Sequence, residues 1–232
     1  METGAVRVHG EGMIAQLDTV IPGLHASAPE RLPFGRALDI RAYLLEREAG
    51  NLLIYRSDTL RREAAAIRER GGIARQYLNH RHEAAPVSDW VTEAFGAPLF
   101  VHADDAEAVS AVSHVRATFS RRHMLDDDFE VIPIPGHTPG ATAYLWDSGR
   151  HRFLFTGDTI TLNDGRWTAA VLDSSDRERY IESLELVRGL DFDVLVPCAA
   201  TAGQPYYAET SPADAARRID AMIDRLRRGE SR

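Results

Sequence analysis

The sequence predicts an α/β fold in which two β-sheets pack face to face and helices cover their outer faces. Each half of the 232-residue chain runs from apolar, strand-like segments into an amphipathic helix. No internal repeat and no low-complexity linker marks a boundary, so we predict one domain over residues 1–232. With 44% apolar residues, a chain of this length can bury a sizeable core.

The first half is predicted to alternate strands with helices. Strand-like apolar segments lie at residues 17–25, 38–46, 51–55, 73–78 and 98–101. Between them, Leu60, Ala64 and Ile67 share one face of a helix that ends at Gly71 and Gly72, and residues 87–95 form a second helix. These segments predict a β-rich opening that is followed by β-α-β-α-β alternation.

The second half repeats the change from strands to helix. Strands are predicted at residues 129–133, 141–146, 153–156 and 193–196. Ser175 and Glu178 have the spacing of a capping box, which predicts a helix from there to Val187. Ser211 followed by Pro212 predicts the start of a final helix, whose apolar face comprises Ala215, Ile219, Met222, Ile223 and Leu226.

Charge and cysteine content exclude several functions. The net charge of -8 argues against nonspecific binding to nucleic acid or to an anionic membrane, because both need a basic surface. No window approaches the roughly 20 apolar residues of a membrane span, and the first residues lack the features of a secretion signal. The single cysteine, Cys198, excludes an intrachain disulfide and a cysteine-cluster metal site. We therefore expect a soluble, cytoplasmic protein in which only His and carboxylate side chains can hold a metal.

Three segments place chemically active side chains directly after predicted strands. They are "NHRHEAA" with His80 and His82, "PGHTPG" with His137, and "FTGDT" with Asp158. A turn after a strand holds a side chain on a rigid support and leaves it open to solvent. Two histidines at positions i and i+2 can face one metal ion only where the backbone is extended or turning. Each segment alone is a weak signal, because a single histidine in a loop is more often a surface or core residue than a ligand.

In this order and spacing, the three segments resemble the metallo-β-lactamase fold superfamily, the group of glyoxalase II-like hydrolases. The resemblance implies a four-layer αββα sandwich with metal ions at the rim between the two sheets. It also implies that His80, His82 and His137 hold one metal ion and that Asp158 is the carboxylate that bridges two ions.

The sequence departs from the family pattern at the ligands of the second metal ion. Ala84 and Ala85 stand where the motif has Asp and His, and residues 197–200 replace the segment that carries the last His. We therefore expect a single metal site. Three imidazoles and a carboxylate suit Zn²⁺, which we favour, and nitrogen ligands can also hold Fe²⁺, Mn²⁺ or Ni²⁺. Asp158 either closes a four-coordinate site or stands back and leaves a position for water.

The resemblance implies a metal-dependent hydrolase that acts on an ester, thioester, lactone or similar acyl bond through a metal-bound hydroxide. In this role Asp158 would ligate the ion or position the water, and Glu83 is the other candidate for the base. The alternative is a non-hydrolytic protein that binds a small molecule in the rim pocket, with or without metal. A metal-dependent lyase or an oxidative role is a further alternative.

The family builds its substrate pocket from loops that here contain Trp167, Tyr206 and Tyr207. These aromatic side chains either line the pocket or pack in the core. Cys198 lies where the family has a loop beside the metal, so its thiolate would ligate or attack, whereas a protonated thiol would be a small buried side chain. The expected partner is a small-molecule substrate or ligand, and the sequence does not indicate an oligomeric state.

Overall fold

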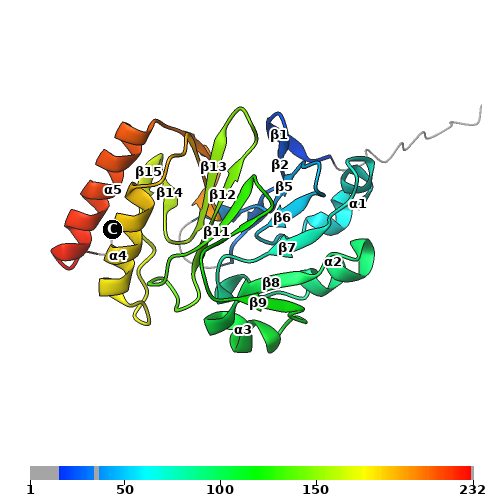
Figure 1. The fold of residues 1–232 in the computed structure, drawn as a ribbon, viewed down its shortest axis with the longest axis horizontal. Coiled ribbons are helices and arrows are strands. Elements are labelled where there is room, and N and C mark those ends of the chain that lie inside the picture. The colour runs from blue at the N-terminus through cyan, green and yellow to red at the C-terminus, as the bar shows by residue number, and fades with distance from the viewer. Residues whose placement is uncertain (1–15, 34–36, 231–232) are drawn as a thin grey trace, which may run out of the picture.

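The computed structural model describes residues 16–33 and 37–230, so the expectation about a secretion signal lies outside the described residues. In Figure 1, strands occupy the middle of the molecule and helices lie on two sides. On one side are α4 (Arg177–Arg188) and α5 (Pro212–Arg227), and on the other are α1 (Leu60–Glu69), α2 (Val87–Phe95) and α3 (Ala103–Ser110). With two main sheets between them, these helices complete the predicted αββα sandwich, which is confirmed.

The first main sheet has seven strands in the order β1-β2-β5-β6-β7-β8-β9. Their bounds are Asp18–Ile21, Leu24–Ala26, Tyr43–Leu45, Leu52–Ile54, Arg75–Tyr77, Leu99–His102 and Ala117–Phe119. The first four strands pair antiparallel. From β6 onward the pairing is parallel, because a helix connects each strand to the next and returns the chain to the same end of the sheet.

The second main sheet has six strands in the order β10-β11-β12-β13-β16-β18. Their bounds are His123–Leu125, Phe129–Pro133, Thr142–Asp147, Arg152–Gly157, Val194–Pro197 and Ala208–Glu209. A third, smaller sheet has the order β15-β14-β17-β4-β3, with bounds Arg166–Thr168, Thr161–Asn163, Ala199–Thr201, Leu38–Ile40 and Glu30–Arg31. This third sheet was not predicted, because strands of two or three residues carry no readable alternation of apolar and polar positions.

Separate apolar clusters hold the four layers together. The cluster between the main sheets combines residues such as Tyr43, Ile54 and Tyr77 of the first sheet with Phe129 and Phe155 of the second. The outer face of the second sheet packs on α4 and α5, and the outer face of the first sheet packs on α1 and α2. A smaller cluster joins β8 to α3. Burial of these faces on both sides is what fixes the positions of the strand ends.

Several predicted boundaries differ from the structure. Predicted strand 17–25 is divided into β1 and β2 by a turn at Gly23, whose φ is 91°, and predicted strand 38–46 is divided into β4 and β5. The cap of α4 is Asp176, whose side chain accepts a hydrogen bond from Arg179 N, and not Ser175. Helix α2 spans the predicted residues, and α5 starts at Pro212 with Ser211 as its cap, as predicted. None of the described helices is long and apolar enough to cross a membrane.

Candidate metal centre

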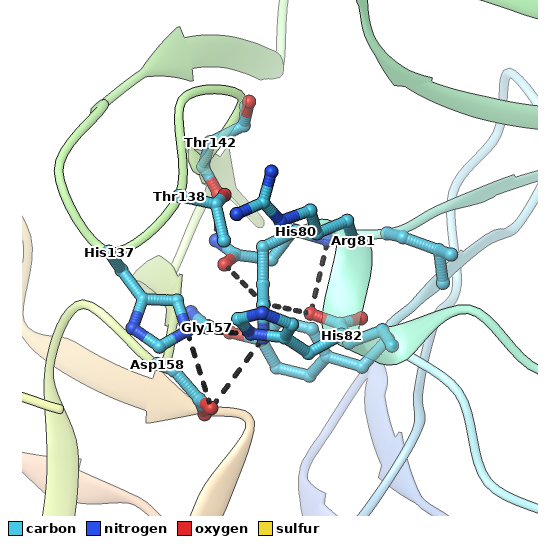
Figure 2. A network of polar contacts seen from close by, with 12 residues as sticks. His80, Arg81, His82, His137, Thr138, Thr142, Gly157 and Asp158 are labelled. Carbon is cyan, nitrogen blue, oxygen red and sulfur yellow. Dashed lines mark hydrogen bonds and ion pairs between the residues drawn. The ribbon is translucent and has the colours of Figure 1, made fainter. Parts of the chain in front are cut away.

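The three segments singled out in the sequence meet where strands β7, β11 and β13 end. His80 and His82 lie at the short 3-10 helix η1 (Arg81–Glu83), His137 lies in the turn between β11 and β12, and Asp158 directly follows β13. Figure 2 shows these side chains pointing toward one another. The three imidazoles offer ligand atoms that all lie within 4.8 Å of one another.

Two oxygen atoms lie within hydrogen-bond distance of Nδ1 of His80, on the side of the ring that faces away from the site. Its Nδ1 lies 3.0 Å from Glu83 Oε1 and 3.0 Å from Asn79 Oδ1, and its side chain is 2% exposed. An Nδ1–H that donates to these oxygens leaves the Nε2 lone pair directed into the site. Burial lowers the pKa of His80, but the hydrogen bond to Glu83 and the charge of Asp158 act against burial and raise the pKa overall.

His137 is held in the same way by a backbone carbonyl. Its Nδ1 lies 2.6 Å from the oxygen of Ala170, so Nε2 faces the site. Burial and the charge on His80 lower the pKa of His137 to about 4, which keeps the ring neutral at ordinary pH. His82 is the exposed member of the group, and its Nδ1 lies 3.2 Å from His137 Nε2. Partial burial and the charges of His80 and Arg81 lower the pKa of His82.

Asp158 faces the histidines from the end of β13. Its Oδ2 lies 3.6 Å from His80 Nε2 and 3.9 Å from His137 Nε2, and the side chain is 27% exposed. Its Oδ1 is buried and has no hydrogen-bond partner among the residues that the structure describes. Because an unpartnered buried carboxylate oxygen costs stability, its presence indicates a site built to bind something.

These four side chains fit a divalent metal ion. Two nitrogen ligands of a tetrahedral Zn²⁺ lie roughly 3.3 Å apart, and His82 Nδ1 and His137 Nε2 are 3.2 Å apart. In both His80 and His137 the Nδ1–H donates to an oxygen atom outside the site. The unprotonated Nε2 of each ring therefore directs its lone pair into the site. Within residues 16–33 and 37–230, the three histidines are the only group of at least three His, Cys, Asp or Glu side chains with this spacing.

Residues that the sequence patterns missed hold the loops of the site in place through hydrogen bonds and close packing. The Asn79 amide donates to the Thr142 carbonyl, and a Cβ atom at Gly157 would overlap the Asn79 side chain. Gly157 N donates to Tyr55 Oη at 2.8 Å, and the Tyr55 hydroxyl donates to Val196 O at 2.8 Å. Tyr55 has a φ of 65°, a conformation that costs a non-glycine residue about 1–2 kcal/mol. The one available sequence signal was a polar Asn79 between an apolar strand and the first histidine.

Glu83 is buried beside His80. Its carboxylate is 4% exposed, accepts a hydrogen bond from Asn79 N, and contacts Nδ1 of His80, the ring nitrogen opposite the one that faces Asp158. Burial raises the pKa of Glu83. A base must reach the attacking water on the substrate side. These contacts make Glu83 a support of His80, and its role as a base stays a prediction.

Trp167 and Cys198 are buried in the core of the structure. Trp167 is 4% exposed, stacks on Phe192 with ring centroids 6.3 Å apart, and lies under the guanidinium of Arg218. Cys198 is 6% exposed within the cluster between the main sheets. Burial raises the pKa of the Cys198 thiol well above its usual value, and a protonated thiol is neither a nucleophile nor a ligand.

Tyr206 and Tyr207 lie in the segment between β17 and β18, where their ring centroids are 5.6 Å apart. Tyr206 donates a hydrogen bond of 2.6 Å to Asp18 Oδ2, and the guanidinium carbon of Arg41 lies 4.1 Å above its ring. Both tyrosines are half-buried. Their membership of a substrate pocket stays a prediction.

Alanines occupy the positions that would hold a second ion according to the resemblance, and their methyl groups pack against apolar side chains. Ala85 is 8% exposed and packs with Val87 and Val91, and Ala84 packs against the cluster that contains Leu99 and Val101. Ala199 and Ala200 are buried as well. We call His80, His82, His137 and Asp158 the histidine side of the site, and we call Ala84, Ala85, Ala199 and Ala200 the alanine side.

The sequence matches a family model described as the metallo-beta-lactamase superfamily over residues 63–199. The uncharacterized protein YmaE of Bacillus subtilis (strain 168) is 32% identical over 107 residues, which are 44% of this chain and 39% of that protein. A hydroxyacylglutathione hydrolase of Pectobacterium carotovorum subsp. carotovorum (strain PC1) is 35% identical over 77 residues, which are 33% of this chain and 27% of that protein. The chain thus spans less than half the length of these curated relatives.

Solved structures show the same fold at low sequence identity. A metallo-beta-lactamase from Pontibacter korlensis superimposes with a TM-score of 0.69 at 12% identity, covering 91% of this chain and 98% of that chain. The structure of TMB-1 gives a TM-score of 0.70 at 14% identity, with the same coverage of 91% and 98%. At these identities the likeness shows the fold alone.

Proposed function

Since the chain belongs to the metallo-beta-lactamase superfamily, we propose that it is a metal-dependent hydrolase of acyl bonds with a single metal site. The observation that carries the proposal is the convergence of His80, His82 and His137, with the lone pairs of His80 and His137 turned inward by acceptors behind them. An ester, thioester or lactone is the proposed substrate class. The relative named hydroxyacylglutathione hydrolase, whose name describes hydrolysis of an acyl bond, supports this class.

Zinc is the ion that we propose for this site. Three neutral imidazoles with a carboxylate nearby are a common donor set for Zn²⁺, and Fe²⁺, Mn²⁺ or Ni²⁺ can use the same nitrogens. A divalent ion held there supplies Lewis acidity, because it lowers the pKa of a water molecule and polarises a carbonyl group. The lowered pKa values of His82 and His137 favour the neutral rings that such binding needs.

Asp158 is the residue that we assign to proton transfer. Its carboxylate faces Nε2 of His80 and of His137 and remains partly open to solvent, so it can reach a water molecule that approaches an acyl carbon. Oδ2 of Asp158 takes the proton as the water oxygen bonds to the acyl carbon. The same carboxyl group then returns this proton to the alkoxide or thiolate that leaves, which yields an acid and an alcohol or thiol.

A second candidate function is supported by the alanine side. Methyl groups at Ala84 and Ala85 pack in apolar clusters and supply no ligand for a second ion. A protein of this family that lacks the second ion can also bind a small molecule without hydrolysing it. In either role the proposed partner is a small molecule, with no nucleic acid or membrane, because the net charge is -8. We propose the cytoplasm as the compartment, with the single buried thiol as support.

The experiment combines metal content with turnover. The protein is purified without added metal, its metal content is measured by mass spectrometry, and a panel of esters, thioesters and lactones is assayed with and without chelator. We expect one ion per chain and turnover that both the chelator and His137→Ala abolish. The matched control is His114→Ala, which replaces an exposed histidine outside the site.

Two outcomes would contradict the proposal of hydrolysis at this site. Protein that contains one ion per chain but turns over no substrate in the panel would favour the binding function. Turnover that His137→Ala and His114→Ala reduce equally would show that the activity does not come from this site.

A further inference from the structure

Asp105, in the first turn of α3, lies between the two loops that carry the histidines. Its Oδ2 accepts a hydrogen bond from Arg81 N at 3.0 Å and a second from Thr138 Oγ1 at 2.7 Å. Arg81 stands between His80 and His82, and Thr138 follows His137. One carboxylate oxygen therefore joins two segments that are more than 50 residues apart in the sequence, since His82 and His137 are separated by 55 residues.

The contact between Asp105 and the His137 loop is close. A Cβ atom built on Gly140 would lie 2.7 Å from Asp105 Cγ and 2.9 Å from Asp105 N, so only glycine fits at this point of "PGHTPG". Asp105 is 1% exposed, and its other oxygen, Oδ1, is buried without a partner among the described residues. The buried carboxylate of Asp105 is therefore packed against both loops and bonded to each of them.

We propose that Asp105 is a positioning residue that sets the spacing between His82 Nδ1 and His137 Nε2, and through this spacing the affinity and geometry of metal binding. The inference rests on the proposed function only for the presence of the metal. Outer partners of metal ligands typically change metal affinity by about 10- to 100-fold. Asp105 differs from such partners because it bonds to the backbone and hydroxyl of neighbouring residues and not to an imidazole.

The test uses Co²⁺ as the probe, since its visible absorption bands report the ligand geometry. Co²⁺ is titrated into metal-free wild-type protein and into Asp105→Ala, Asp105→Asn and Asp104→Ala. We expect Asp105→Ala to weaken binding by about 10- to 100-fold and to shift the absorption bands. Asp105→Asn should restore most of the affinity and the wild-type spectrum, because its amide oxygen can accept both hydrogen bonds. Asp104→Ala is the control, because it removes the same charge from the same turn and its side chain is 59% exposed.

Two results in these titrations would overturn the proposal. The first is an Asp105→Ala protein with the affinity and spectrum of Asp104→Ala. The second is an equal loss in Asp105→Ala and Asp105→Asn, which would assign the effect to the charge. If Asp105→Ala does not fold, Thr138→Val removes one of the two donors without changing the side-chain shape. That variant should weaken Co²⁺ binding by a smaller factor, and wild-type affinity in it would overturn the proposal.

Hydrogen exchange separates this inference from the proposed function. If wild-type protein binds no Co²⁺, the proposed function fails, but the role of Asp105 is still measurable in the metal-free proteins. Faster amide exchange at residues 80–83 and 137–140 in Asp105→Ala than in Asp104→Ala would support the positioning role. Equal exchange rates in the two variants would overturn it.

Discussion

The histidine side and the alanine side of the site are close in sequence but differ in what surrounds them. His80 and Ala85 are both buried and only five positions apart, yet His80 is enclosed by polar acceptors and Ala85 by aliphatic side chains. The 3-10 helix η1 ends at Glu83, and the chain then turns away from the site into the apolar cluster beneath α2. The alanine side is thus part of the core, whereas polar acceptors orient His80 and His137 on the histidine side.

His80 and His82 should contribute equally to metal binding but differently to the stability of the fold. Both His80→Ala and His82→Ala should weaken metal binding by about 100-fold or more, since each removes a ligand rather than its outer partner. His80→Ala should also lower the free energy of unfolding by about 1–3 kcal/mol, because the buried Glu83 carboxylate loses the imidazole and keeps only the Asn79 N–H as donor. For the exposed His82 we expect a change of about 0.5 kcal/mol or less. Chelator competition and urea unfolding measure the two quantities, and equal stability of the variants would contradict this account.

Asp158→Asn tests the carboxylate that we assign to proton transfer. We expect a decrease in kcat of about 10²- to 10⁴-fold, because the amide cannot accept a proton, while the three histidines still bind the ion. Metal content and steady-state kinetics are measured on the same preparation. Asp173→Asn, at an exposed position in the loop before α4, is the matched control. Loss of the metal together with the activity would instead make Asp158 an indispensable ligand.

Glu83→Gln and Glu83→Ala test the support behind His80. The glutamine oxygen can still accept from Nδ1–H, so we expect about a 10-fold loss of metal affinity, whereas alanine should cost up to about 100-fold. The measurement is competition with a chelator of known affinity. A glutamine variant that binds metal normally but does not turn over substrate would support the base hypothesis for Glu83.

The double variant Ala84→Asp/Ala85→His introduces the Asp and His of the family motif and tests whether the alanine side can then hold a second ion. We expect the metal content to stay at one ion per chain, because Ala85 packs in an apolar cluster with Val87 and Val91. The larger side chains should lower the free energy of unfolding by about 1–3 kcal/mol through overpacking. Metal analysis and thermal unfolding test both statements, and two ions per chain would disprove our account of the alanine side.

The metal-free protein should also show a pH dependence of its stability. Burial and the charge on His80 lower the pKa of His137 from 6.5 to about 4, so between these values the unfolded chain binds more protons than the folded protein at this residue. This contribution to stability is complete above pH 6.5 and decreases as the pH falls toward 4. His137→Asn should remove it. Melting temperatures of both proteins, measured with chelator from pH 7 to pH 4, should differ in slope over this window, and parallel curves would contradict the prediction.

The sequence predicted the parts of the molecule that depend on local pattern. Helix α2 and the start of α5 were predicted because apolar periodicity and caps are encoded within a few residues. The histidine side was predicted because its motifs follow strand ends in a fixed order. Asp105 was missed because its function depends on contacts with Arg81 and Thr138, which are 24 and 33 residues away.

The directions of two side chains, Trp167 and Glu83, could not be read from the sequence for one physical reason. Trp167 was placed in a substrate loop, but strand β15 turns it under α5, a helix that begins 45 positions later. Glu83 was considered a base because it follows His82, but η1 directs its carboxylate inward to Nδ1 of His80. In both cases the sequence showed which residue was present and tertiary packing decided the direction of its side chain.

The hydroxyl of Tyr55 has a consequence for when the site can form during synthesis. It bonds to Gly157 N and Val196 O, which lie 102 and 141 residues further along the chain. A chain that grows from its N-terminus therefore carries His80 and His82 long before the turn that bears Asp158 can be fixed in place. The group formed by His80, His82, His137 and Asp158 can therefore reach the described geometry only after β16 has been synthesised and pairs with β13.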